Sequence, residues 1–413
     1  MTESLAWKPA NLHVSHSWGG GLGRWIRNFC GADPYSNSLV LQSHGSHDAY
    51  GVEHRLEHAG TGAVLERWGL STPVTEIGID NPRYAEKLQQ LIGRYGIEHL
   101  YISSFIGHSL DLLDLDVAMT IVYHDYFPFC PALNLTFVDV CKSCMPHKLR
   151  LCLDKNPLAT GFRQNRPEYW QRLRESYFAR LRRPRLNHVS PSLSVQRNLG
   201  SVDERFNELE FRNIEHGIDY RKSDCFGGAE HGRQLRFLVL GILSPFKGQA
   251  RLRRLLPQLR LLGDIYLVGS GSSGREFAGR AGVTLIEEYT RDELPSILAD
   301  LRPDLALFLG DVPETFSFTL SEAWAHGIPV CAPRLGSFED RIEDGRTGFL
   351  VDLDEDSLIS TLVDVEAERG RLLDVASEIA RRPVRSLEEM VDDYYELRDD
   401  YLVWCEQRLG HGA

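Results

Sequence analysis

The 413-residue chain lacks the features of an exported or membrane-spanning protein. It has no run of 18 consecutive apolar residues, and its N-terminal segment has no basic region followed by an apolar core. Positive charge is in deficit, because 46 Lys and Arg residues face 58 Asp and Glu residues and give a formal net charge of −12. That balance disfavours nucleic acid as a general partner. Low-complexity tracts and short repeats are absent too. We therefore expect a soluble, cytoplasmic protein.

The length exceeds the size at which one hydrophobic core keeps growing, and favours two domains of about 200 residues each. Short β-branched runs alternate with helical patterns along the chain. Ten runs predict strands: 37–43, 97–104, 117–125, 186–192, 235–241, 264–271, 283–289, 304–310, 328–333 and 347–352. This alternation is typical of doubly wound parallel sheets. The predicted fold class is α/β, with two Rossmann-like domains facing across a cleft.

The alternation restarts after the polar, glycine-rich segment at residues 220–234, which we interpret as a linker. We predict a first domain at residues 1–215 and a second at 216–385. Residues 386–413 predict a C-terminal helix able to pack back on the first domain. Ligands of such sheets bind at the carboxyl ends of the strands, so the loops that follow strands are the places to search.

Two loops after predicted strands suit an anion. In HVSHSWGGGLGRW, residues 13–25, Gly20 and Gly21 precede the helix that holds Arg24. Glycines there let backbone N–H groups approach a phosphate, and the helix N-terminus adds a favourable dipole. In LGILSPFKGQ, Lys247 offers a compact positive charge.

A third glycine-rich loop, YLVGSGSSGREF, follows the next strand. Gly269, Gly271 and Gly274 satisfy the dinucleotide-binding fingerprint formally, and Glu287 lies near its acidic position. The fingerprint belongs to the first βα turn of its domain, whereas a strand and the Lys247 loop precede it here. NAD or NADP binding is therefore the minor alternative.

Two carboxylates stand in the otherwise apolar, small-residue segment PETFSFTLSEAWAHGIPV. These are Glu314 and Glu322, at the place where a loop is expected to enter a helix. A carboxylate accepts several hydrogen bonds and suits the vicinal hydroxyls of a sugar. A capping box between Thr319 and Glu322 is a structural alternative for the second carboxylate, but it leaves Glu314 unexplained.

The segments GILSPFKGQ, LVGSGSSG, AHGIPVCAP, LGSFEDRIEDGRTGFLVD and IEHGID, together with the glutamate pair, occur in a familiar order and spacing. Over residues 186–352 the chain resembles the retaining group 1 (family 4) glycosyltransferases of GT-B architecture. The resemblance implies that Glu314 contacts hydroxyls of the donor sugar and that Glu322 contacts the ribose of the nucleotide. Lys247 would neutralise the donor diphosphate as the bond to the sugar breaks.

The resemblance also supplies a wider set of candidate donor contacts. His124, in the strand-end segment IVYHDYFP, matches a histidine that contacts the donor sugar, and His108 is a weaker candidate for the acceptor. The remaining candidates for donor binding are Gly20, Gly21, Arg24, Phe316, Ser317, Phe318 and Thr319.

The chain departs from the family pattern at Ile242, where members usually carry an arginine shortly before the lysine. One positive charge is therefore missing from the expected diphosphate site. Arg24, Arg334 or another basic residue replaces it, or the site is weaker, or the protein is not a catalyst.

Four of the eight cysteines fall within 23 residues, and two of them form a Cys-x2-Cys pair. They are Cys130, Cys141, Cys144 and Cys152, with His147 nearby. Four thiolates suit a structural zinc or iron ion in a closed tetrahedral site. We predict a metal-pinned insertion at residues 130–152, with reduced free thiols as the alternative.

Residues 163–185 hold eight arginines against two glutamates. Their apolar stripe at helical spacing consists of Trp170, Leu173, Tyr177 and Leu181. A basic amphipathic helix can contact an anionic membrane or a lipid-linked acceptor. A solvated helix packed on the first domain is the alternative.

The resemblance implies a retaining glycosyltransferase, and we expect no organic cofactor. It would move a hexose from a nucleotide-diphosphate sugar to a bacterial cell-surface polysaccharide of the O-antigen, lipopolysaccharide or capsule type, or to a lipid-linked glycan. It would be cytoplasmic, with peripheral contact at the inner face of the inner membrane. The alternatives are a nucleotide-sugar epimerase or hydrolase of the same fold, and a non-catalytic subunit that binds nucleotide sugars or glycans.

Overall fold

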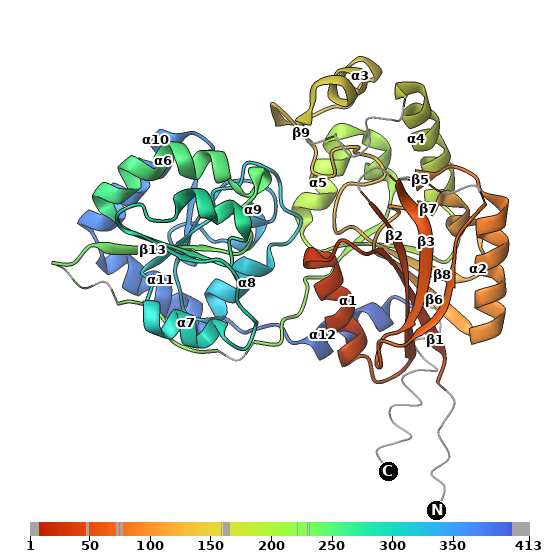
Figure 1. Cartoon of the computed structure of the whole chain (residues 1–413), viewed down its shortest axis with the longest axis horizontal. Coiled ribbons are helices and arrows are strands. Elements are labelled where there is room, and N and C mark those ends of the chain that lie inside the picture. The colour runs from red at the N-terminus through yellow and green to blue at the C-terminus, as the bar shows by residue number, and fades with distance from the viewer. Residues whose placement is uncertain are drawn as a thin grey trace, which may run out of the picture. The chain divides into compact units, whose positions relative to one another are not determined.

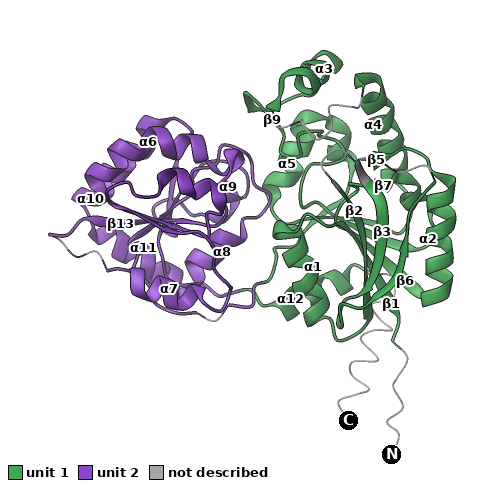
Figure 2. Ribbon diagram, viewed as in Figure 1, with its two compact units in different colours: residues 1–217, 385–413 green, residues 218–384 purple. Residues whose placement is uncertain are grey.

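The computed structural model describes residues 8–46, 49–71, 74, 77–157, 159, 166–220, 222–228, 230 and 232–398. The chain divides into two compact units (Figures 1 and 2). Unit 1 comprises residues 1–217 and 385–413, and unit 2 comprises residues 218–384. The chain therefore leaves unit 1 once and returns to it.

Unit 1 is built on a mixed sheet, which among the described residues has eight strands in the order β12-β11-β8-β6-β1-β2-β3-β4. The strands are β1 Ala10–His16, β2 Asn37–Ser46, β3 Ala49–His58, β4 Val64–Trp68, β6 Ile97–Ile102, β8 Ala118–Val122, β11 Leu186–Ser190 and β12 Phe211–Asn213. Strands β12 to β2 pair in parallel, and β3 is antiparallel to both of its neighbours, β2 and β4. Strand β1 lies between β2 and β6, so the order of the strands reverses beside it.

Helices cover this sheet, and two more short strand pairs complete the unit. The helices are α1 Gly20–Ala32, α2 Pro82–Tyr95, α3 Pro146–Lys155, α4 Pro167–Leu181, α5 Leu193–Val202 and α12 Leu387–Glu396. The short strands are β5 Ile77–Gly78 with β7 His108–Ser109, and β9 Thr136–Phe137 with β10 Asp139–Val140. The described part of the predicted C-terminal helix is α12, and residues 399–413 lie outside the described residues.

Local signals explain where α2 and α12 begin. The side chain of Asn81 accepts a hydrogen bond from the backbone N–H of Tyr84, with Pro82 in the first turn. Helix α12 begins with a capping box between Ser386 and Glu389. It then packs on α1, where the ring centroid of Tyr394 lies 5.5 Å from that of Trp25.

Unit 2 contains a fully parallel sheet, with six strands among the described residues in the order β15-β14-β13-β16-β17-β18. The strands are β13 Leu235–Leu240, β14 Gly263–Val268, β15 Val283–Ile286, β16 Leu305–Leu307, β17 Val330–Pro333 and β18 Phe349–Val351. The helices are α6 Gln249–Leu262, α7 Leu294–Leu301, α8 Phe318–Ala325, α9 Ser337–Arg341, α10 Glu355–Ala367 and α11 Gly370–Arg381. The order reverses between β13 and β16, which makes that pair the topological switch point of the sheet.

The predicted α/β fold class is confirmed, since every one of the ten predicted strand segments overlaps an observed strand. Strands β3 and β4 were not predicted. Their sequences, AYGVEHRLEH and VLERW, alternate apolar with charged residues and lack the continuous β-branched runs of the parallel strands. An antiparallel edge can face water on one side, so it does not need such runs.

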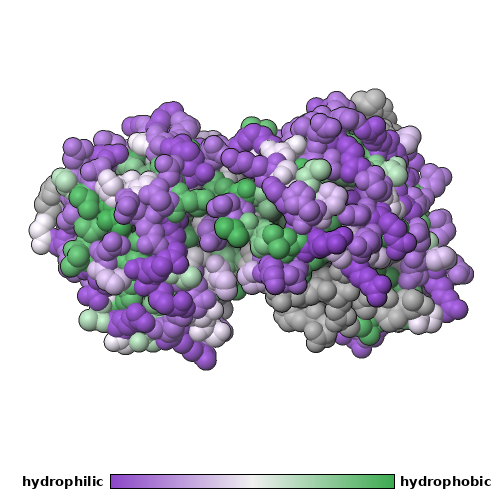
Figure 3. Space-filling model, turned by 90° about the horizontal axis from the view of Figure 1, so that it is seen from above, coloured by the Kyte–Doolittle hydropathy of each residue, from purple (hydrophilic) through white to green (hydrophobic). Residues whose placement is uncertain are grey.

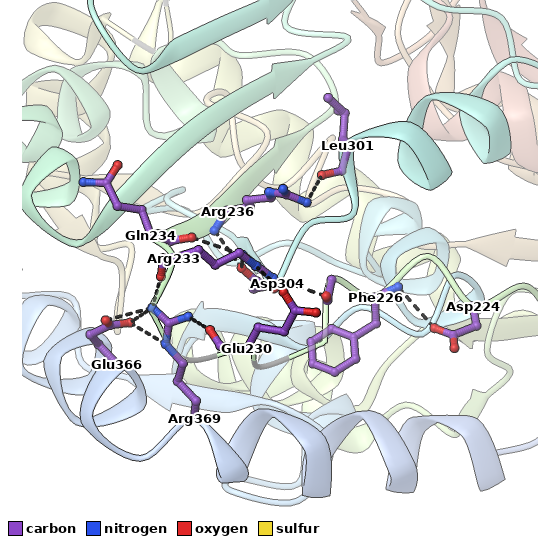
Figure 4. Close-up of polar contacts among 11 residues, drawn as sticks. Asp224, Phe226, Glu230, Arg233, Gln234, Arg236, Leu301, Asp304, Glu366 and Arg369 are labelled. Atoms are coloured by element: carbon purple, nitrogen blue, oxygen red, sulfur yellow. Dashed lines mark hydrogen bonds and ion pairs between the residues drawn. The ribbon is translucent and has the colours of Figure 1, made fainter.

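A buried ion pair ties the segment that enters unit 2 to the sheet (Figure 4). The guanidinium of Arg233 donates two hydrogen bonds of 2.6 Å to the fully buried carboxylate of Asp304. The backbone N–H of Arg236, in β13, donates to the same carboxylate at 2.9 Å. Buried Arg369 donates to the backbone oxygen of Arg233 at 2.6 Å and also pairs with Glu366. The linker is thus fixed where β13 and β16 begin.

Candidate functional site

The switch point of unit 2 brings together two loops that are distant in the sequence. Lys247 ends a short 3-10 helix in the loop after β13, and Glu314 lies in the loop after β16. The loops are in close contact because Gly248 has a φ of +85° and no side chain. A Cβ atom at Gly248 would lie 2.2 Å from the backbone oxygen of Leu309. Only glycine fits both the backbone conformation and the space.

Lys247 and Glu314 form an ion pair in which Nζ lies 2.5 Å from Oε1. The lysine side chain is 46% exposed and the glutamate side chain 13%. The cation therefore faces the solvent, whereas the carboxylate is set into the protein. This geometry places a charge pair at the position where ligands of doubly wound sheets bind.

The loop that carries Glu314 is held by helix α9. The backbone N–H of Ser337 donates to the backbone oxygen of Glu314 at 2.8 Å. Buried Arg341 donates to the backbone oxygens of Phe316 at 2.6 Å and Ser317 at 3.1 Å, and its guanidinium lies 3.9 Å from the ring centroid of Phe316. Sequence reasoning missed Arg341, because no local pattern indicates a contact over more than 20 residues.

Helix α8 begins at Phe318, with Ser317 as its N-cap at a φ of 66°. Thr319 is therefore the second helical residue, and no side chain caps this helix, so the capping-box alternative for Thr319 and Glu322 is wrong. Glu322 lies within the helix and is buried. Its Oε1 accepts a hydrogen bond of 2.8 Å from the hydroxyl of Tyr220.

The candidates of unit 1 lie near the switch point of its own sheet. Gly20 and Gly21 start α1 after β1 and are exposed, and Arg24 is half-buried on the same helix. His124 follows β8, and its ring centroid lies 4.9 Å from that of Trp25. Burial lowers the pKa of His124 to about 3, so the imidazole is neutral at physiological pH.

Known proteins place these features in a family. Residues 234–367 match the model of the family described as Glycosyl transferases group 1. They form a group 1 glycosyltransferase domain. A GDP-mannose-dependent alpha-mannosyltransferase of Mycolicibacterium smegmatis is 35% identical over 100 residues, which are 24% of this chain and 22% of that protein. The match thus spans about a fifth of the length of this relative.

Solved structures extend the similarity to nearly the whole chain. Sucrose-phosphate synthase from Thermosynechococcus elongatus has a TM-score of 0.62 at 15% identity, covering 98% of this chain and 100% of the other. Anabaena Alr3699/HepE in complex with UDP-glucose has a TM-score of 0.57 at 15% identity, covering 94% of this chain and 98% of the other. The predicted GT-B fold class is confirmed.

An exposed isoleucine occupies the position at which the resemblance to group 1 glycosyltransferases led us to expect an arginine. Ile242 follows β13, and 70% of its surface is exposed. Arg334 follows β17 and donates a hydrogen bond of 2.7 Å to Asp344. Arg334 precedes Gly336 by two residues. The backbone of Gly336 lies so close to Glu314 that a Cβ atom added to this glycine would be 2.7 Å from the backbone nitrogen of Glu314. The loop that carries Arg334 therefore packs on the backbone of Glu314 two residues further along the chain.

Two further titratable residues of unit 1, His108 and Asp125, lie near the ends of its strands. His108 is buried, with Nδ1 2.7 Å from the hydroxyl of Tyr84 and Nε2 2.7 Å from the backbone oxygen of Ser15, so both ring nitrogens are occupied. Asp125, which sequence reasoning overlooked, follows His124 directly. Burial raises the pKa of Asp125 to about 7. Its position directly after a strand-end histidine is the sequence feature that could have identified it.

The predicted zinc or iron site is not supported. Among the residues that the structure describes, no group of three or more His, Cys, Asp or Glu side chains could hold a metal ion. The four cysteines of the prediction, Cys130, Cys141, Cys144 and Cys152, are all free thiols.

Two of these thiols have polar neighbours, and a third is deeply buried. The Sγ atom of Cys144 accepts a hydrogen bond of 3.1 Å from Arg174, and that of Cys152 accepts one of 3.2 Å from Asn156. Burial raises the pKa of Cys130 to about 12. The alternative of reduced thiols agrees with these contacts.

The apolar stripe of α4 is part of the core of unit 1. Trp170, Leu173, Tyr177 and Leu181 are all buried there. On the outer side, Arg180 donates to Asp114 at 2.8 Å and to Asp80 at 3.2 Å. The stripe is therefore unavailable to a membrane. Residues 163–165 of the predicted helix lie outside the described residues.

Proposed function

We propose that the protein is a retaining glycosyltransferase that moves a hexose from a nucleotide-diphosphate sugar to a bacterial cell-surface polysaccharide or lipid-linked glycan. The observation that carries the proposal is the pair of Lys247 and Glu314 at the switch point of a group 1 glycosyltransferase domain. The structure of Anabaena HepE with UDP-glucose, on a similar fold, supports a donor of this class.

The two members of the pair have different roles. The largely buried carboxylate of Glu314 accepts hydrogen bonds from sugar hydroxyls, and the exposed ammonium of Lys247 faces the diphosphate. The first turn of α8, at Phe318 and Thr319, offers backbone N–H groups to the same anion. Stabilisation of a departing diphosphate by groups already in place is an electrostatic contribution to catalysis. Binding of the donor then exchanges the ion pair for contacts with the ligand.

Retention follows if the departing phosphate takes the proton of the acceptor on the same face of the sugar. No protein nucleophile is needed for this route. Glu322 would contact the ribose, in exchange for or alongside the hydroxyl of Tyr220. The contribution of His124 and of the Gly20 and Gly21 loop to the donor site stays a prediction.

We further propose that Arg334 supplies the positive charge that Ile242 lacks. Its guanidinium lies in the loop after β17, whose next residues pack on the Glu314 backbone, and its partner Asp344 is exposed. Exposed ion pairs contribute little to stability, so a diphosphate can displace Asp344 at small cost.

Substitution of Glu314 tests the proposal. Glu314→Gln keeps the size of the side chain but removes a charged, two-oxygen acceptor, and we expect transfer from the donor to fall at least about a hundredfold. Glu355→Gln is a matched control, because Glu355 pairs with Arg254 on an exposed part of α10. Thermal shifts with UDP-, GDP-, ADP- and dTDP-sugars identify the donor, since a ligand of the folded state raises its stability. Unchanged transfer by Glu314→Gln would remove Glu314 from the mechanism.

One observation favours a second function, a non-catalytic nucleotide-sugar-binding subunit. Exposed Ile242 leaves the region after β13 with one cation fewer than in the family. Calorimetry that detects donor binding, without release of nucleotide in the presence or absence of acceptors, would favour this function. Nucleotide release without any acceptor would instead indicate a hydrolase or epimerase.

A further inference from the structure

A small projection of unit 1 exposes apolar side chains. We call residues 136–155 the finger; it consists of the hairpin of β9 and β10 and of helix α3 (Figure 1). Val138 is 89% exposed, Met145 56% and Leu151 50%. The other side of the finger is anchored, because Leu149, Cys152 and Leu153 belong to the core of unit 1.

Val138 is unfavourable in two respects: its backbone adopts a left-handed conformation, and its apolar side chain is exposed to water. It connects Phe137 to Asp139, which are paired across the hairpin, and its φ is 66°. A β-branched residue in this left-handed region is a conformational outlier, and such strain costs of order 1–3 kcal/mol. Glycine or asparagine would turn the chain without that cost. Neither the backbone conformation nor the packing of the finger therefore accounts for a valine at this position.

The exposed apolar residues lie among positive charges. The finger carries Lys142, Lys148, Arg150 and Lys155 against the two carboxylates of Asp139 and Asp154. Two of the basic side chains have carboxylate partners: Lys155 lies 3.1 Å from Asp154, and Arg150 lies 3.5 Å from Glu168 of α4. The whole chain, by contrast, has a formal net charge of −12. On the face that Figure 3 shows, unit 1 is largely hydrophilic, with small hydrophobic groups set among polar ones. The finger thus combines apolar tips with a local excess of positive charge.

We propose that the finger docks the protein on an anionic lipid bilayer. Val138, Met145 and Leu151 enter the headgroup region, while the four basic side chains contact lipid phosphates. This pattern fits a bilayer, which attracts basic side chains and accepts isolated apolar ones. A stable protein interface buries about 20–30 residues a side, more than a projection of this size exposes. Helix α4 does not serve this role, because its stripe is buried.

Among the described residues no helix is long and apolar enough to cross a bilayer, so the docking is peripheral. It would bring the enzyme to a lipid-linked acceptor, but it does not depend on the proposed transfer reaction. Vesicle binding and donor binding are separate measurements. Failure of one therefore leaves the other informative.

The test is flotation of the full chain with vesicles of phosphatidylcholine, with and without phosphatidylglycerol, at low and high salt. Val138→Asn removes the apolar tip and suits the left-handed backbone, so we expect vesicle affinity to fall about tenfold while thermal stability stays equal or rises. Val64→Asn is the matched control, because Val64 is a 46% exposed valine elsewhere in unit 1. It should leave binding unchanged.

Charge is tested separately. Lys148→Gln and Arg150→Gln should each lower affinity for the anionic vesicles about fivefold at low salt. The proposal would be overturned by no binding of the parent protein to anionic vesicles at low salt, by equal binding to neutral vesicles, or by unchanged binding of Val138→Asn. Self-association that depends on Val138, seen by sedimentation without vesicles, would assign the finger to a protein interface and equally overturn it.

Discussion

At the scale of single residues, the pair of Lys247 and Glu314 is organised for binding rather than for stability. An ion pair whose cation is nearly half exposed contributes at most about 1 kcal/mol to folding. The protein nevertheless fixes the backbone of Glu314 through Ser337 and the loop through Arg341. Such support around a weak pair is typical of a preorganised site.

The role of Arg334 is a prediction at the same scale. Arg334→Ala should lower kcat of the proposed transfer about tenfold to a hundredfold, with a smaller change in donor KM, because the missing charge matters most when the diphosphate departs. Steady-state kinetics with the donor found by thermal shift measure both constants. Arg346→Ala is the control, since Arg346 is an exposed arginine that pairs with Glu343. Equal kinetics of the two variants would exclude Arg334 from the site.

At the scale of elements, buried polar groups determine how segments are tied to the sheets. Helix α12 returns to unit 1 after the whole of unit 2, and the hydroxyl of Tyr395 donates to buried Asp33 at 3.0 Å. Asn11 in β1 donates to the same carboxylate at 3.3 Å. In unit 2, Arg233 and Asp304 fix the linker in the same manner (Figure 4). These contacts hold together segments that are distant in the sequence, and no local sequence pattern indicates that they meet.

Removal of the Asp304 carboxylate should therefore destabilise unit 2. Asp304→Ala leaves the guanidinium of Arg233 without its buried partner, and we expect the free energy of unfolding to fall by about 3–5 kcal/mol. Glu230→Ala is a matched control, because Glu230 pairs with the same arginine at 3.6 Å but is largely exposed. It should cost less than about 1 kcal/mol. Urea unfolding checks both, and equal losses would contradict the assigned role of burial.

At the scale of the whole molecule, the two units differ in their content of buried histidines. Burial lowers the pKa of several histidines of unit 1, to about 3 for His13, His108 and His124 and to about 4 for His54 and His188. In the described part of unit 2, only His326 has a lowered pKa. The units should consequently respond differently to acid.

Unit 1 should lose stability before unit 2 as the pH falls below about 6.5. Above that value these histidines are neutral in both states, so they cause no pH dependence. Below it these histidines bind protons in the unfolded chain but not in the folded unit. The free energy of unfolding therefore falls by about 1.4 kcal/mol per pH unit for each such histidine, until the pH reaches the folded pKa near 3 or 4. Hydrogen exchange followed by mass spectrometry at pH 7.5, 6 and 5 reports the two units separately. Faster loss of protection in unit 2 would contradict this prediction.

The sequence by itself determined the α/β class, the positions of most parallel strands and the resemblance of residues 186–352 to group 1 glycosyltransferases. Parallel strands buried on both faces need continuous apolar runs, and such runs are visible locally. Only the tertiary structure decided that Lys247 meets Glu314, that α4 buries its stripe and that the four cysteines form no metal-sized ligand group within the described part of the chain. Those outcomes depend on contacts between segments distant in the chain and on whether water reaches a side chain, and neither is encoded in local periodicity or spacing.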